Sequence, residues 1–186
     1  MDVGSDSVNP YSSFVFTIPP LSDAKTKLVD HIKRNPGIRY KELQRLTGLS
    51  NGVLSYHLAT LEKANVITVE RQTRTTRIYP INFSERESSV LKHLRNKPER
   101  QIMIVLLKHD MMTFNELVEV TGKAPSTVSS HMKRLKEDGL VHVRHGENVS
   151  LYSITNKDVI ADLLSKYRES FADMVVDNFT GIIDEL

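Results

Sequence analysis

The sequence predicts a mainly α-helical fold with small β-hairpins (α+β), built as two tandem copies of one unit and completed by a C-terminal helix. Its 186 residues are enough for two small domains. Short signatures recur at an offset of 74 residues, as when Glu42-Leu43 returns as Glu116-Leu117. In each copy, apolar residues at helical spacing give way to a short hairpin pattern.

The first copy predicts three helices and a hairpin, in that order. Apolar residues at helical spacing precede a break at 35–37, where Asn, Pro and Gly follow one another. A short helix is expected over 40–46 and a longer one over 53–64, with a tight turn between them. A hairpin is expected over 66–81, with its polar tip at 71–76.

The second copy repeats this order with clearer boundary signals. Thr113-x-x-Glu116 is a capping box that opens the short helix. Pro125 suits the first turn of the longer helix, and Gly139 suits its end. A hairpin is expected over 140–154. Helix, short helix, turn, longer helix and hairpin together define a winged helix-turn-helix, so the sequence predicts two such domains in tandem.

Further segments flank and connect the two copies. Ser84-x-x-Glu87 is another capping box and predicts a helix between them. The first residues are rich in Ser, Asn and Asp, which is typical of a flexible segment, and the apolar stretch 14–18 suits a short docking strand. The expected domains are a flexible N-terminal segment (1–20), the first winged helix domain (21–82), a connecting helix (83–98), the second winged helix domain (99–155) and a C-terminal helical segment (156–186).

Two motifs carry a resemblance to a known family. Segments 54–67 (LSYHLATLEKANVI) and 128–141 (VSSHMKRLKEDGLV) resemble the recognition helix and first wing strand of ArsR/MarR-type regulators. Tandem copies in one short chain are most similar to archaeal tandem winged-helix transcription regulators. The resemblance covers about 130 of the 186 residues. It implies a DNA-binding fold and a terminal helix that forms dimers.

Charge is unevenly distributed along the chain. The formal net charge is only +2. Residues 1–24 carry three Asp and no Lys or Arg, and residues 155–186 carry seven acidic and three basic residues. Residues 25–154 therefore carry a net charge of +9. A basic body between acidic ends favours a polyanionic partner such as double-stranded DNA.

Missing residues and motifs argue against other function classes. Zero cysteines exclude a disulfide scaffold, a thiolate zinc site and a cysteine nucleophile. No histidine follows His145, so we expect no metal site on a terminal helix. No phosphate loop, nucleophile elbow or HExxH helix is present, so we expect no enzyme and no cofactor. The longest apolar run, 102–107, is far below the roughly 18 residues that span a bilayer, and no signal peptide opens the chain, which predicts a cytoplasmic protein without a membrane partner.

A helical projection separates buried from outward residues on the two longer helices. At 100° per residue, Val53, Leu54 and Leu58 fall on one apolar face of the first, so the opposite side should face DNA. Wings and helix termini should reach phosphates. The expected DNA-contacting residues are Lys41, Ser50, Asn51, Ser55, Tyr56, Ala59, Thr60, Lys63, Arg71, Thr73, Arg74 and Arg77 in the first copy, and Lys123, Ser126, Thr127, Ser129, Ser130, Lys133, Arg134 and His145 in the second.

The two copies place their basic residues differently. Arg71, Arg74 and Arg77 lie in a wing tip without an acidic residue, where we expect contact with phosphates or the minor groove. The second copy concentrates its basic residues on the longer helix and has Glu147 in its wing tip, which favours contact through the helix. The alternative is ordinary solvated charge, which we favour for Lys136 alone.

One histidine recurs at the same position of both longer helices, as His57 and His131. An imidazole at such a position could bind a metal, sense pH or contact DNA. Because both lie within the apolar stripe, we favour a structural role in which they pack and hydrogen-bond between the helix and the hairpin.

The C-terminal segment carries apolar residues at steps of three and four, which predicts about thirty helical residues with a break near 178–181. The resemblance implies that this segment forms a homodimer, which would present four winged helices to a pseudo-palindromic site. The alternative is a helix that only covers the second copy. The expected dimerisation residues are Ile160, Leu164, Tyr167, Phe171 and Met174.

These patterns together favour a sequence-specific, double-stranded-DNA-binding transcription regulator. A protein-interaction module, of the kind found in chromosome-segregation or polymerase-associated complexes, is the alternative, and it does not need a basic body. Nonspecific architectural DNA binding is a third possibility. Nothing in the sequence indicates a small-molecule effector.

Overall fold

The computed structural model describes residues 23–174. The first domain consists of α1 (Asp23–Arg34), β1 (Ile38–Arg39), α2 (Tyr40–Thr47), α3 (Asn51–Lys63), β2 (Ile67–Gln72) and β3 (Thr75–Pro80). The second contains α5 (Lys97–Lys108), β4 (Met112–Thr113), α6 (Phe114–Thr121), α7 (Pro125–Glu137), β5 (Val141–His145) and β6 (Ser150–Ile154). The remaining elements are α4 (Glu85–Leu94), α8 (Lys157–Lys166) and a 3-10 segment, η1 (Arg168–Met174).

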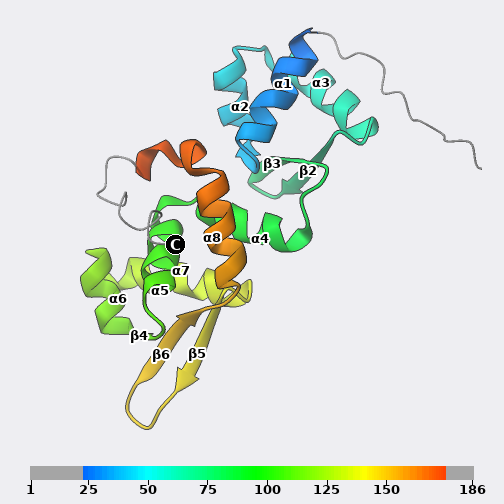
Figure 1. The fold of residues 1–186 in the computed structure, drawn as a ribbon. Coiled ribbons are helices and arrows are strands. Elements are labelled where there is room, and N and C mark those ends of the chain that lie inside the picture. Colours follow the sequence, from blue (N-terminus) through cyan, green and yellow to red (C-terminus); the bar gives the residue numbers. More distant parts are fainter. Residues whose placement is uncertain (1–22, 175–186) are drawn as a thin grey trace, which may run out of the picture.

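The predicted fold class is confirmed: the domains are mainly helical, and each has one small antiparallel sheet (Figure 1). The strand orders are β1-β3-β2 and β4-β6-β5, so the two sheets have the same topology. The sequence did not predict β1 and β4, because a strand of two residues shows no alternation of apolar and polar side chains. Each short strand pairs with the second strand of the hairpin and makes that strand central.

The first hairpin is longer than its sequence indicates. The expected polar tip at 71–76 is wrong, because Gln72 pairs with Thr75 and only residues 73–74 form the turn. Polar residues can continue a strand where both sides are solvated, which hides the strand from a hydrophobicity pattern. Arg71 is therefore a strand residue, and Arg74 lies at the tip.

The helix boundaries follow the capping signals. The boxes at Ser84 and Thr113 are confirmed, since each hydroxyl accepts a hydrogen bond from the N–H of the third helical residue, and that residue's Glu side chain accepts one in return. The hydroxyl of Ser50 caps α3 by accepting a hydrogen bond from the N–H of Val53. Gly48 ends α2 with a φ of +66°, in the left-handed region that favours glycine.

Two apolar cores support the domains. The first contains α1, α2, α3 and the inner face of its sheet. The second extends further, because α5 is apolar on nearly all sides and must be covered on all of them. Helices α4, α6 and α7 and strand β6 provide this cover, α8 packs against α4, and Tyr79 of β3 packs into the same core. The connecting helix α4 is therefore part of the second domain's core.

The structure corrects the prediction that these apolar residues form a dimerisation stripe. Ile160, Leu164, Tyr167 and Phe171 are all buried in the second core, so these side chains are not available to a second copy. They cover the second copy instead, which was the alternative interpretation. The guanidinium groups of Arg95 and Arg100 lie 5.2 and 5.3 Å from the Phe171 ring centroid, a cation–π arrangement. The side chain of Met174 and the expected break near 178–181 lie outside the described residues.

The structure also corrects the prediction of one long C-terminal helix. α8 ends at Lys166, and the chain continues as a 3-10 segment with a non-helical backbone at Phe171. Phe171 lies beyond this change of direction and is buried in the second core. The expected flexible segment 1–20, including the apolar stretch 14–18, lies outside the described residues.

Polar contacts join the two domains. Arg95 on α4 donates from Nε to the carbonyl of Pro36 (3.1 Å) and from Nη1 to the carbonyl of Ser170 (3.2 Å). Gly37 lies against the ring of Tyr79, where a Cβ atom would come within 3.0 Å of that ring.

The second hairpin extends away from the body, whereas the first lies beside α4 (Figure 1). Within residues 23–174, no helix is long and apolar enough to cross a membrane.

Candidate nucleic-acid interface

The second recognition helix, α7, presents a polar and basic outer face. Val128, Met132 and Leu135 are buried in the core, so the opposite side of the helix is exposed. Pro125 occupies the first turn, as its sequence position predicts. The exposed residues on this side include Ser126, Ser129, Ser130, Lys133 and Arg134, while Thr127 and Lys123 are half-buried.

The first recognition helix, α3, has a different outer face. Leu54, Leu58 and Leu61 are buried as expected, but Val53 is 44% exposed rather than part of the core. Val53 lies at the edge of the projected apolar stripe, about 70° from its centre. Tyr56 is 66% exposed. The remaining expected residues on this side are Asn51, Ser55, Ala59 and Lys63, all exposed, and Thr60, half-buried.

A tyrosine on α2 contacts the polar groups at the start of α3. Tyr40 Oη lies 2.8 Å from both Ser55 Oγ and Asn51 Oδ1, and it donates to the carbonyl of Asn51 at 3.0 Å. The sequence offered no signal for this contact. At the same position of the second copy stands Phe114, which has no hydroxyl to offer Ser129. The hydroxyl of Ser55 is thus engaged within its domain in a way that the second copy does not repeat.

A groove lies between α2 and the first wing. It has a volume of about 460 Å³, and its walls carry Arg39, Lys41, Arg45 and Arg74. Glu42 is the acidic residue in the lining, and its carboxylate accepts a hydrogen bond from the backbone N–H of Arg39. Four cations and one acid make this groove suited to phosphate groups.

Arg39 and Arg45 were not among the expected DNA-contacting residues. The repeat contains a usable signal, because Arg39, Lys41 and Arg45 have Thr113, Asn115 and Glu119 as their counterparts at the offset of 74. The start of the first helix-turn-helix is basic, and the start of the second is not.

The wing arginines have three different environments. Arg74 is exposed at the tip, as predicted. Arg71 forms two hydrogen bonds to the carboxylate of Glu62 on α3, at 2.6 and 2.8 Å. These hydrogen bonds from Arg71 lower the pKa of the Glu62 carboxyl. The pair is solvent-exposed, so it contributes little to stability and its arginine stays accessible to a phosphate.

Arg77 is a correction: it is not a surface residue of the wing. Its side chain is only 8% exposed, and it donates to the carbonyls of Gly37 (2.9 Å) and Lys92 (3.4 Å). Burial lowers the pKa of its guanidinium. The reason is topological, since β3 is the central strand and is covered by β1 and α4. Arg77 joins the first domain to α4 and cannot contact DNA in this arrangement.

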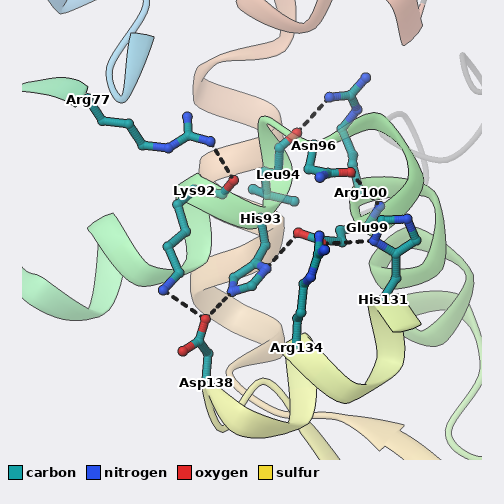
Figure 2. Close-up of polar contacts among 10 residues, drawn as sticks. All are labelled: Arg77, Lys92, His93, Leu94, Asn96, Glu99, Arg100, His131, Arg134 and Asp138. Atoms are coloured by element: carbon teal, nitrogen blue, oxygen red, sulfur yellow. Dashed lines mark hydrogen bonds and ion pairs between the residues drawn. The ribbon is translucent and has the colours of Figure 1, made fainter. Parts of the chain in front are cut away.

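A buried carboxylate contacts two side chains of the second recognition helix (Figure 2). Glu99, at the start of α5, is 3% exposed. Its oxygens lie 2.9 Å from Nδ1 of His131 on α7 and 2.8 Å from Nδ1 of His93 on α4. Arg134 Nη1 approaches the same carboxylate at 3.4 Å. One side chain therefore ties α7 to two neighbouring helices.

The network continues to the C-terminal end of α7, where Asp138 follows the helix. His93 Nε2 lies 2.6 Å from a carboxylate oxygen of Asp138, and Lys92 Nζ lies 2.7 Å from that oxygen. Burial alone raises the pKa of the Glu99 carboxyl, but the hydrogen bonds with His93 and His131 outweigh it, so the pKa lies below its ordinary value. Partial burial alone raises the pKa of the Asp138 carboxyl. Hydrogen bonds with Lys92 and His93 outweigh this effect, so the pKa lies below its ordinary value.

The two repeated histidines have different roles. His131 is structural, although its partner is a helix rather than the expected hairpin. His57 is half-buried, and within the described residues its Nδ1 atom makes no hydrogen bond. In this part of the chain, no group of three or more His, Cys, Asp or Glu side chains has a geometry that could hold a metal ion.

Comparison with known proteins supports the division into two domains. Residues 22–91 match the family model of an N-terminal HTH domain, and residues 97–143 match that of the bacterial regulatory protein, arsR family. The chain therefore carries two helix-turn-helix domains in tandem. Helix-turn-helix transcriptional regulators are built from domains of this class. The second of these domains is similar to the ArsR family, as the motifs in 128–141 predicted.

Curated relatives have similar descriptions. The chain is 27% identical over 134 residues to MJ1398 of Methanocaldococcus jannaschii, an uncharacterized HTH-type transcriptional regulator. That alignment covers 72% of this chain and 34% of MJ1398, so the chain spans about a third of the length of this relative. It is 28% identical over 87 residues to the HTH-type transcriptional regulator YgaV of Escherichia coli, covering 46% of this chain and 88% of YgaV.

A solved structure matches about half of the chain. HlyU from Vibrio cholerae is 24% identical, with a TM-score of 0.40, and the match covers 47% of this chain and 97% of HlyU.

Proposed function

We propose that this chain is a sequence-specific regulator of transcription that binds double-stranded DNA through both winged helices. One observation carries the proposal: each domain presents an exposed recognition helix next to side chains that can bind phosphate. In the first domain these are the four cations of the groove between α2 and the wing. In the second they are Lys133 and Arg134 on α7 itself. The matched families and the relatives named as transcriptional regulators support the same activity.

The net charge of the body favours DNA over the protein-interaction alternative. Residues 25–154 carry +9, which a protein-docking module does not require. A cytoplasmic location is part of this proposal. So is a homodimer, although the buried stripe of α8 and η1 cannot form its interface. Sedimentation equilibrium tests it by distinguishing the monomer mass of 21.2 kDa from twice that value.

Two measurements test the function. Selection from a random duplex library should enrich one motif, and binding to the enriched duplex should weaken by roughly 10³- to 10⁵-fold between 50 and 200 mM salt if six to ten phosphates are contacted. In a plot of log affinity against log salt, the slope should fall by about one for Arg74→Ala and by about one for Lys133→Ala.

Lys27→Ala is the matched control, because Lys27 is an exposed cation on α1, paired with Asp23 and on neither recognition helix nor wing. Its slope should equal that of the parent chain. Failure to enrich any motif contradicts sequence-specific binding. An unchanged slope in one of the two test variants removes that domain from the interface.

A further inference from the structure

The outer face of the first recognition helix is apolar where that of the second is polar. We define the apolar face of α3 as Val53, Tyr56 and Ala59, which are all exposed. At the offset of 74 residues their counterparts on α7 are Thr127, Ser130 and Lys133. The two helices have the same position in the same fold, so the difference lies in what their outer faces can contact.

The polar groups beside the apolar face already have partners. Asn51 Oδ1 and Ser55 Oγ each lie 2.8 Å from Tyr40 Oη. A base edge that approaches this end of α3 therefore meets two side chains that hydrogen-bond within the domain, and next to them the methyl groups of Val53 and the ring of Tyr56. The first turns of a recognition helix are the part that reaches base edges.

In the major groove, the apolar group that distinguishes one base from the others is the C5-methyl group of thymine. We propose that α3 reads thymine methyl groups through Val53, Tyr56 and Ala59, whereas α7 reads hydrogen-bonding base edges. This inference rests on the proposed DNA-binding function and states which feature of the target the first domain recognises. The target should accordingly have two parts, of which the one beneath α3 requires thymine.

The surroundings of the apolar face favour DNA over a protein as its occupant. The exposed Lys63 lies on the same side of α3, and the cations of the groove lie next to the helix start, where Tyr40 lines the groove and contacts Asn51. A stable protein interface buries about 800 Å² on each partner and depletes lysine from its centre. Three apolar side chains among cations are instead suited to a base edge between two phosphate strands.

The experiment uses the full chain and a duplex selected from a random library. Each thymine of the selected motif is replaced singly by deoxyuridine, which lacks only the methyl group. At one or more thymines the affinity should fall about 2- to 5-fold, the effect of losing one buried methyl group. The double variant Val53→Ser/Tyr56→Ser removes the valine methyl groups and the tyrosine ring from this face, and its affinities for the thymine and deoxyuridine duplexes should differ by less than those of the parent chain.

Ser130→Ala on α7 is the matched control, because Ser130 is the counterpart of Tyr56. It should lower the affinity for both duplexes alike and leave their ratio unchanged. Both positions of the double variant are exposed, so circular dichroism should show a folded chain.

The outcomes separate this inference from the function on which it rests. If selection enriches no motif, the proposed function itself fails. If a motif is enriched but deoxyuridine has no effect, or has the same effect in the double variant, the reading of thymine by α3 is wrong. If the double variant binds both duplexes as the parent does but loses self-association in sedimentation, the apolar face contacts a second copy of the chain.

Discussion

The two winged helices share a topology and differ in how they distribute charge and polarity. In the first, cations line the groove between α2 and the wing, and the recognition helix presents Val53 and Tyr56. In the second, the recognition helix itself carries Lys133 and Arg134. The repeated residues are those that build the helices and the turn, so a sequence repeat predicts a repeated fold but not a repeated surface.

The repeated histidine shows the same lesson inside the core. His131 bonds to Glu99, whereas the counterpart of Glu99 in the first copy is Lys25, which cannot accept a hydrogen bond. His57 is left without a bond to Nδ1 among the described residues. The role of each histidine is therefore set by a residue on another helix, not by the motif that contains it.

Replacing Glu99 should reveal this difference most strongly. Glu99→Ala removes the partner of Nδ1 in both His93 and His131 and should lower the free energy of unfolding by about 3 kcal/mol. Urea denaturation followed by circular dichroism measures the change. Lys25→Ala, at the same position of the first copy, should change it by no more than about 0.5 kcal/mol. Equal losses in the two variants would show that the network contributes nothing specific to the second domain.

The same carboxylate should make stability depend on pH. The pKa of Glu99 lies below its ordinary value of 4.5 in the folded chain, so the unfolded chain binds more protons at acidic pH. The stabilisation is present above pH 4.5 and is lost as the pH falls through the lowered pKa. Glu99→Gln lacks this titration.

We therefore expect the stability difference between the parent chain and Glu99→Gln to shrink on acidification below pH 4.5. Urea denaturation at a series of pH values measures it. The capping carboxylates of Glu87 and Glu116 titrate alike in both proteins, so their contributions cancel in the difference. A difference that is constant across this range would contradict a lowered pKa at Glu99.

A smaller effect should follow from Tyr40→Phe, which makes the first domain resemble the second. The variant loses the hydroxyl that contacts Asn51 and Ser55, and it should lose about 1 kcal/mol of stability in urea denaturation. The reverse change, Phe114→Tyr, should bring no equal gain, because Pro125 replaces Asn51 as its neighbour. Equal and opposite effects would mean that the two domains do not differ at this contact.

The sequence was sufficient for features that depend on neighbouring residues in the chain. Both capping boxes and the buried leucines of α3 followed from local patterns. Features that depend on which element covers a surface could not be predicted in this way. Arg77 belongs to a strand that β1 and α4 cover, and the Phe171 stripe covers α5 instead of a second copy.

Long-range pairs were equally hidden. Glu99 and His131 are 32 residues apart, and the periodicity of either helix says nothing about the other. The repeat itself contains a signal for the basic groove. Arg39, Lys41 and Arg45 are basic, whereas their counterparts at the offset of 74 residues are not.

The contacts of Arg77 and Arg95 across the domain boundary hold the first domain against α4, which belongs to the core of the second. A protein that reads two segments of one duplex with rigidly spaced helices also measures the number of base pairs between them. Each inserted base pair turns the second segment by roughly 35° about the helix axis, since B-DNA completes a turn in about 10 to 10.5 base pairs. Such a chain would select its targets by spacer length as well as by sequence, and a single insertion would weaken a site whose bases are all intact.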